Sequence, residues 1–243
     1  MTWRLKLKLS LDQFNLEVDI ESDAQHLAFI GLNGSGKSTL LKAIAGAYPQ
    51  LEGVIEVGGR PLFDSYSGVN IPIEMRGLGY VPQGNSILPH LTALENMCFG
   101  AIPKHMSPSQ LKMAASSWLK TLGCSNLAGS HGSILSTGQR QRITLARVLL
   151  RRPRALLLDE PLSNIDPITR RQLRHLLQSH LNEHNPFSLM MTHDHRDVIN
   201  TAQIVCVLED GKVVQLDTPQ AVAANPVNPF ADAFFDGAVL PSP

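Results

Sequence analysis

Two short stretches of the chain have the residue types that hold phosphate groups. The first is GLNGSGKST at positions 31–39, and the second is the Ser-Thr-Gly-Gln core of ILSTGQRQR at positions 134–142. In the first stretch, glycines allow backbone N–H groups to turn toward phosphate oxygens, and a helix that begins near Lys37 adds the positive end of its dipole. The residues expected to bind a nucleotide here are Gly31, Asn33, Gly34, Ser35, Gly36, Lys37, Ser38 and Thr39.

Lys37 and Ser38 have separate expected roles in this phosphate loop. The Lys37 ammonium group can reach the terminal phosphates, and the Ser38 hydroxyl can be offered to Mg²⁺. An ordinary glycine-rich turn is the alternative interpretation, so a second motif has to decide between the two.

That second motif is ALLLDEP at positions 155–161, where four apolar residues end in two carboxylates. Asp159 is expected to hold Mg²⁺ through its water shell, because Mg²⁺ keeps several of its waters. Glu160 suits a general base that polarises an attacking water. An acidic turn after a core strand is a common feature, but together with the phosphate loop the pair predicts a nucleotide-hydrolysing site.

The elements that must position these groups follow from the pattern of apolar residues. The short apolar runs at 26–30 and 155–159 are typical of buried strands, and residues 37–47 favour a helix with one apolar face. Residues 3–9 and 14–20 alternate polar and apolar side chains, as half-buried strands do.

Later segments continue the alternation of strands and helices. A helix is expected from Pro167 to about His184, capped by Asp166, and a hairpin is expected to turn at Asp210 and Gly211. Strands that alternate with helices predict an α/β fold around a largely parallel sheet. The helix-rich stretch at about 89–150 would form a second lobe, with breaks at Pro103, Pro108, Gly123 and Gly129.

Composition limits the class of partner and the compartment. The 21 basic and 21 acidic side chains cancel, which gives no electrostatic reason to expect a nucleic acid partner. The three cysteines, Cys98, Cys124 and Cys206, are isolated and favour a reducing compartment. Since no window of about 18 apolar residues occurs, we expect a cytoplasmic chain that does not span a membrane by itself.

With the phosphate loop and the two carboxylates in place, residues 135–139 resemble the signature motif of the ATP-binding cassette (ABC) ATPases. Gln83 in GYVPQG matches the Q-loop glutamine, residues 163–166 match the D-loop, and His193 in LMMTHD matches the switch histidine. The resemblance runs from about residue 13 to 225. It implies a P-loop NTPase fold with a RecA-like parallel-sheet core, an N-terminal antiparallel β subdomain and a helical lobe.

The resemblance also explains why one chain carries two phosphate-handling elements. Ser136 can cap the following helix, with Gly138 allowing close approach of the backbone, which makes a second anion-binding helix terminus. In the family this terminus closes on the ATP that another subunit holds, so a head-to-tail dimer with two composite sites is implied. By this resemblance Ser136, Gly138 and Gln139 bind ATP.

Roles in phosphoryl transfer follow from the same resemblance. The catalytic residues would be Glu160, His193, Lys37 and Gln83. The Mg²⁺ ligands would be Ser38, Gln83 and Asp159. The cofactors implied are therefore ATP and Mg²⁺.

Three features leave alternatives open. Phe14 lies where family members stack an aromatic ring on adenine, but it could equally be a core residue. Thr137 replaces the usual glycine of the signature, which puts the rate of closure in doubt. The helix histidines His175, His180 and His184 do not converge on a metal by their spacing and are expected to be surface or packing residues.

The block LFDSYSGVNIPIEMRGLGYVPQGNSILPHLTALENMCFG at 62–100 is similar to the corresponding part of molybdate, tungstate and sulfate importer ATPases. The resemblance predicts the peripheral ATPase subunit of a bacterial importer for an oxyanion such as molybdate, at the cytoplasmic face of the membrane. Its partners would be separate transmembrane permease subunits and, indirectly, an extracytoplasmic substrate-binding protein. Alternatives are import of polyamine, iron or sugar, an exporter, and a soluble ABC ATPase without a transport role.

Domain boundaries complete the expectations. Residues 1–230 would form the cassette, with the helical lobe at about 88–150, and residues 231–243 would be a surface tail. Residues 84–100 would form the groove for a coupling helix of the permease, although Ile87, Leu88 and Leu91 could equally be core of the lobe. Many related ATPases carry a further β-rich regulatory domain, for which this sequence shows no counterpart.

Overall fold

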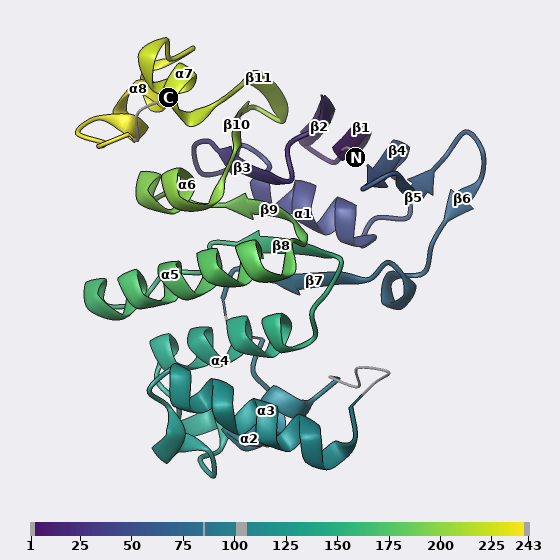
Figure 1. Ribbon diagram of the computed structural model, residues 1–243. Helices are drawn as coiled ribbons and strands as arrows, with labels where there is room; N and C mark the ends of the chain where they lie inside the picture. Colours follow the sequence, from purple (N-terminus) through teal and green to yellow (C-terminus); the bar gives the residue numbers. More distant parts are fainter. Residues whose placement is uncertain (1–2, 85, 101–105, 241–243) are drawn as a thin grey trace. The chain divides into compact units, whose positions relative to one another are not determined.

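The computed structural model describes residues 3–84, 86–100 and 106–240 (Figure 1). The chain divides into two compact units, which are described separately. The first unit comprises 1–78, 154–160 and 186–243, and the second comprises 79–153 and 161–185.

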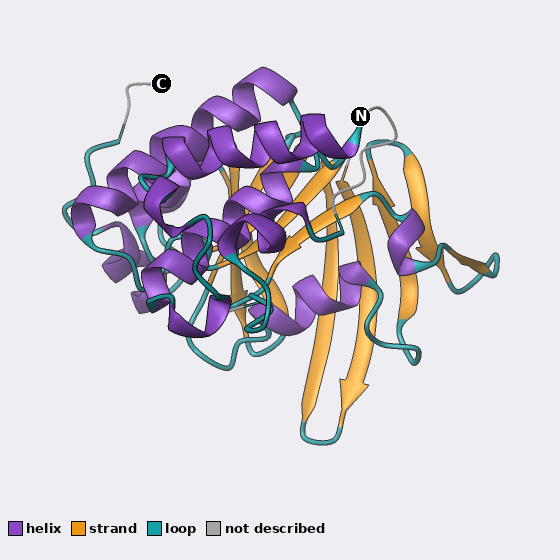
Figure 2. Cartoon of the chain, turned by 90° about the horizontal axis from the view of Figure 1, so that it is seen from below, coloured by secondary structure: helices purple, strands orange, loops and turns teal. Residues whose placement is uncertain are grey.

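The first unit is built around a mixed sheet (Figure 2, strands in orange). Its strands follow the spatial order β6-β5-β4-β1-β2-β11-β10-β3-β9-β8. Their bounds are β1 Trp3–Leu11, β2 Phe14–Ser22, β3 His26–Ile30, β4 Glu52–Val57, β5 Arg60–Asp64, β6 Val69–Asn70, β8 Ala155–Asp159, β9 Phe187–Met191, β10 Ile204–Glu209 and β11 Lys212–Asp217. Its helices are α1 Lys37–Ala45, the 3₁₀ turn η1 Ile73–Met75, α6 His195–Thr201, α7 Pro219–Ala224 and α8 Pro229–Phe235.

Two kinds of strand pairing confirm the predicted fold class. Strands β10, β3, β9 and β8 pair in parallel, and every residue of β8 is buried, as expected for a strand covered on both faces. Strands β1, β2, β4 and β5 pair antiparallel, and β1 alternates buried and exposed side chains. The continuous apolar run at 155–159 therefore forms a strand of the parallel core. The alternating run at 3–9 forms a strand of the antiparallel N-terminal part.

The β1–β2 hairpin is longer than the predicted strands. Its pairing continues to Leu11 opposite Phe14, which leaves only Asp12 and Gln13 in the turn. The predicted hairpin at Asp210 and Gly211 is also present, and both turn residues have positive φ (46° and 78°), as two-residue type I′ turns require.

The second unit is mainly helical. Its elements are β7 Leu78–Val81 at the border between the units, α2 Ala93–Cys98, α3 Pro108–Thr121, the 3₁₀ turns η2 Ser125–Leu127 and η3 Gly132–Ile134, α4 Thr137–Leu150 and α5 Pro167–His184. Helices α2, α3 and α4 contact one another. Thr92, Ser107 and Ser136 each close a capping box at the start of α2, α3 and α4.

The boundaries of the second unit differ from the predicted lobe at 88–150. The unit starts at residue 79 and includes α5, whose Leu176 and His180 line a cavity of about 510 Å³ together with Trp118 of α3 and Leu149 of α4. Pro108 does not break a helix but opens α3, because proline fits the first helical turn. The predicted break at Pro103 lies outside the described residues.

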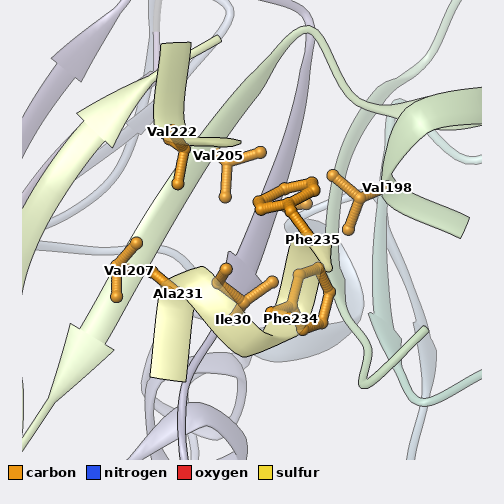
Figure 3. Packing of buried hydrophobic residues seen from close by; sticks show 9 residues of the cluster. Ile30, Val198, Val205, Val207, Val222, Ala231, Phe234 and Phe235 are labelled. Atoms are coloured by element: carbon orange, nitrogen blue, oxygen red, sulfur yellow. The ribbon is translucent and has the colours of Figure 1, made fainter. Parts of the chain in front are cut away.

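The last helices belong to the core of the first unit (Figure 3). Phe234 and Phe235 of α8 pack with Val198 of α6 and with Ile30 of β3, and their rings meet edge to face at 5.0 Å. The predicted start of a separate tail at residue 231 falls inside α8, where Ala231, Phe234 and Phe235 are buried. The apolar side chains of α8 form one face, and that face is covered rather than solvent-exposed.

Two further expectations can be compared with the structure. All three cysteines are free thiols, with Cys124 and Cys206 buried. Over residues 3–84, 86–100 and 106–240, no helix combines the length and the apolar character that crossing a bilayer requires.

Candidate functional site

The glycine-rich loop lies between β3 and α1 and forms a backbone cradle. Gly34 and Gly36 have positive φ, 84° and 102°, which L side chains rarely adopt. At Gly31 a Cβ would lie 2.2 Å from the Leu208 carbonyl oxygen, so only glycine fits. The Nζ of Lys37 donates to the carbonyl oxygens of Gly31 (2.7 Å) and Leu32 (2.8 Å) and thus folds back over the loop.

The start of α1 fits an anionic ligand. Its first turn has no side-chain cap, so its N–H groups are open to an acceptor from outside the helix. The hydroxyl of Ser35 is buried without a hydrogen-bond partner, and buried polar groups normally have one. Burial lowers the pKa of Lys37, which the negative charges of Glu160 and Asp159 oppose. These features fit the phosphates of a nucleotide.

The two predicted carboxylates lie at the end of β8. Asp159 is buried, and Glu160 follows in the left-handed region with φ of 50°. A non-glycine residue there is uncommon and is characteristic of strained functional positions. The Glu160 N–H donates to the Met191 carbonyl oxygen at 2.9 Å, which fixes this turn to the end of β9.

His193 meets Glu160 directly. The distance from His193 Nε2 to Glu160 Oε1 is 2.8 Å, and the two side chains are 40% and 16% exposed, respectively. The structure therefore brings the predicted general base and the predicted switch histidine together at the same edge of the parallel sheet. A carboxylate held in this way can orient a water molecule toward a phosphate.

The predicted Mg²⁺ ligands of the first unit are Asp159 and Ser38, and carboxylate and hydroxyl oxygens are the donors that this ion prefers. Among the described residues, no group of three or more His, Cys, Asp or Glu side chains is placed to hold a metal ion. A magnesium ion at Asp159 and Ser38 would need phosphate oxygens and water to complete its coordination.

Phe14 lies next to the phosphate loop. A Cβ on Gly36 would come within 2.5 Å of the Phe14 ring, so the ring packs on the backbone at the start of α1. Phe14 and Gly34 also line a cavity of about 620 Å³ together with Asn15, Asp210 and Lys212. The ring is therefore in place either to support the loop or to contact a base, and base stacking stays a prediction.

In the second unit, Ser136 caps α4 as predicted. Its Oγ accepts from the Gln139 N–H at 3.3 Å, and Gln139 Oε1 accepts from the Ser136 N–H at 2.8 Å. The helix begins at Thr137, directly after this cap. A Cβ on Gly138 would meet the Asn164 carbonyl oxygen at 3.5 Å, so the signature and the D-loop are neighbours.

The comparisons with known proteins now decide the family. Residues 13–163 match the family described as ABC transporter. The chain belongs to this family. One relative, the sulfate/thiosulfate import ATP-binding protein CysA of Nephroselmis olivacea, is 35% identical over 93% of this chain and 63% of its own length. The chain therefore spans less than two thirds of that relative.

Two further similarities have different coverage. The probable sulfate/thiosulfate import ATP-binding protein CysA of Chlorella vulgaris is 33% identical over 93% of this chain and 92% of its own length. The ATP-binding cassette MJ0796, solved as a dimer in a post-hydrolysis state with ADP and phosphate, has a TM-score of 0.74 at 26% identity. That similarity covers 89% of this chain and 97% of the other, which confirms the ABC ATPase fold.

The predicted site residues are divided between the two units. Lys37, Asp159, Glu160 and His193 lie together in the first unit. The second unit contains Gln83, which is exposed after β7, together with the signature.

Two buried polar residues close to His193 in the sequence, Thr192 and Asp197, were not predicted as functional. In the sequence these residues are a threonine and an aspartate where a buried strand passes into a helix. Such residues are common at helix starts, so their types alone do not indicate a functional role.

Proposed function

We propose that the chain is the ATP-hydrolysing subunit of an ABC importer for an inorganic oxyanion. The observation that carries the ATP-hydrolysing part of the proposal is the 2.8 Å contact between Glu160 and His193 beside a phosphate loop whose helix start has no side-chain cap. The reported relatives are named for sulfate and thiosulfate, so sulfate replaces molybdate as the leading substrate.

In the proposed reaction, phosphoryl transfer to water depends on positioning and on charge stabilisation. Backbone N–H groups of residues 31–38 and the Lys37 ammonium hold the phosphates. Ser38 and Asp159, with Gln83 as the family resemblance implies, would hold a Mg²⁺ ion, which would supply positive charge to the phosphate oxygens. Glu160 orients the water, and His193 holds Glu160 and contacts the γ-phosphate.

Completion of the site is proposed to need a second copy of the chain. Ser136 and Gly138 of one copy would close on the ATP held by the other, and the dimeric ADP-bound relative supports such an arrangement. Transmembrane permease subunits would then receive the motion at the cytoplasmic face of the membrane, with a substrate-binding protein outside. The groove at 84–100 is the proposed contact for the permease.

Uptake of radioactive sulfate tests this function. A strain that lacks the gene is complemented with wild type, with Glu160→Gln, or with Glu183→Gln, whose carboxylate is 73% exposed. We expect wild type and Glu183→Gln to restore sulfate uptake and Glu160→Gln to fail. If wild type restored uptake of molybdate but not of sulfate, molybdate would be the substrate. If all strains, including the deletion strain, took up both anions equally, the importer assignment would be refuted.

A further inference from the structure

The loop that carries His193 is fixed on both sides by one buried hydroxyl. Thr192 Oγ1 accepts from the Asp194 N–H at 3.1 Å and donates to Asp197 Oδ2 at 2.9 Å. Thr192 and Asp197 are each 3% exposed, whereas the His193 side chain is 40% exposed. The imidazole therefore projects from a backbone whose two neighbouring residues are held by buried hydrogen bonds.

The same loop is fixed to Glu160 at its other end. Met191, the last residue of β9, accepts the Glu160 N–H at 2.9 Å. Asp194 caps α6 by accepting from the Arg196 N–H at 2.9 Å, and Asp197 lies in the first turn of that helix. Strand β9, the loop and α6 thus form a continuous support for the contact between His193 and Glu160.

We propose that Thr192 and Asp197 are positioning residues that set the orientation of His193 toward Glu160. This inference rests on the proposed ATPase function. The buried Asp197 carboxylate accepts a hydrogen bond from the Thr192 hydroxyl, which leaves a lone pair of the hydroxyl oxygen to accept from the Asp194 N–H. Misplacement of a reacting group by about 1 Å can cost on the order of 100-fold in rate. Loss of the Thr192 hydroxyl should therefore act on turnover more than on nucleotide binding.

The central test compares three variants of the full chain. Thr192→Val keeps the side-chain shape and removes both hydrogen bonds, and Thr192→Ser keeps the hydroxyl. Thr201→Val is the matched control, because Thr201 is 8% exposed on the same helix and donates to the Asp197 carbonyl oxygen at 2.7 Å. We expect Thr192→Val to lower kcat for ATP by about 10- to 100-fold with an unchanged KM. Thr192→Ser and Thr201→Val should keep kcat within about twofold.

A double-mutant cycle separates positioning from general destabilisation. In a His193→Ala background, Thr192→Val should slow hydrolysis by less than about twofold, because the residue it positions is already absent. The inference would be overturned if Thr192→Val slowed hydrolysis by the same factor in the wild-type and His193→Ala backgrounds. It would also be overturned if Thr201→Val lowered kcat as much as Thr192→Val does.

A second measurement does not depend on hydrolysis. Histidine side-chain NMR, with the His193 signal assigned by its loss in His193→Ala, should show that signal shifted or broadened in Thr192→Val and unchanged in Thr201→Val. An unchanged signal in Thr192→Val refutes the positioning role. If Thr192→Val changes the His193 signal but the wild-type chain releases no phosphate from ATP, the positioning role stands and the proposed ATPase function is refuted.

Discussion

Helices α1 and α4 begin in opposite ways, although both follow a stretch that suits phosphate. Helix α1 starts after Gly36, at φ of 102°, with no side-chain cap. Helix α4 starts after Ser136 with a complete capping box. The first helix thus leaves N–H donors open for a ligand, whereas the second satisfies the N–H groups of Ser136 and Gln139 within the chain.

The difference shows what each terminus can offer to a phosphate. The backbone of residues 31–38 is preformed as a cradle in a single copy. At the signature, the Ser136 oxygen already accepts from Gln139, so its hydroxyl hydrogen is what remains to donate. The first terminus is suited to hold ATP alone, and the second is suited to add a contact to phosphates that another cradle already holds.

The most damaging change in the first unit should be Glu160→Gln. We expect phosphate release to fall by about 10²- to 10⁴-fold, because an amide cannot act as a general base, while ATP binding persists. Isothermal titration and phosphate-release assays measure the two properties, and Glu183→Gln serves as control. Since closed dimers should accumulate with ATP, size-exclusion chromatography that shows only monomers would contradict the role of Glu160.

The signature can be tested against a helix start of the same kind. Ser107 caps α3 with Gln110 as Ser136 caps α4 with Gln139. Ser107→Ala and Ser136→Ala should each lower the free energy of unfolding by about 1 kcal/mol. Only Ser136→Ala should slow hydrolysis, by about 10²-fold if its hydroxyl donates to the transition state.

Ser136→Arg should abolish hydrolysis without weakening ATP binding to the monomer, because the bulk meets the second copy. Weaker ATP binding by the monomer would show that the signature acts within its own chain.

The two glycines at these helix starts should respond differently to alanine. Gly36→Ala introduces a side chain at positive φ and against the Phe14 ring, and it should cost about 1–3 kcal/mol of unfolding free energy and weaken ATP binding. Gly138→Ala has its nearest neighbour at 3.5 Å and no positive φ, so the free monomer should keep its stability. Urea denaturation and nucleotide titration of both variants provide the comparison.

The smallest effect concerns the stability of the second unit at mild acidity. Burial, with the positive charges of His184 and Arg152, lowers the pKa of His180 from 6.5 to about 4. Between these values the unfolded chain binds a proton that the folded chain does not, so the unfolding free energy falls as pH falls, by up to about 1.4 kcal/mol per pH unit.

Urea denaturation from pH 7 to 4.5, followed by fluorescence of Trp118, whose ring centroid is 6.1 Å from that of His180, measures this dependence. His180→Gln should flatten it, and His175→Gln, an exposed position on the same helix, should not. Equal slopes in the wild type and His180→Gln would contradict the assignment.

Local signals in the sequence were sufficient for much of the fold. The bounds of β3, β8 and α5, the Asp166 cap and the turn at Asp210 follow from apolar runs and capping residues within one element. The cap by Ser136 and the parallel arrangement of the core strands follow in the same way.

Features that depend on contacts between distant segments could not be predicted. The left-handed conformation of Glu160 depends on the Met191 carbonyl oxygen on the next strand. The burial of Phe234 and Phe235 depends on the α6 surface, and the place of α5 in the second unit depends on packing around Trp118. The spacing of apolar residues predicts that a helix has an apolar face, but it does not predict which other segment packs against that face.

The first unit is assembled from three separate parts of the sequence, and this affects how the chain is made. Strand β3 pairs with β10, and β2 meets β11, so the sheet needs residues that are translated much later than β2 and β3. Strand β3 and the phosphate loop that follows it are translated long before β9 and β10, the two strands that pair with β3, and such non-local pairing forms slowly. During synthesis, the apolar β3 and α1 segments therefore remain uncovered, and we expect a stalled or truncated nascent chain to be a substrate for chaperones.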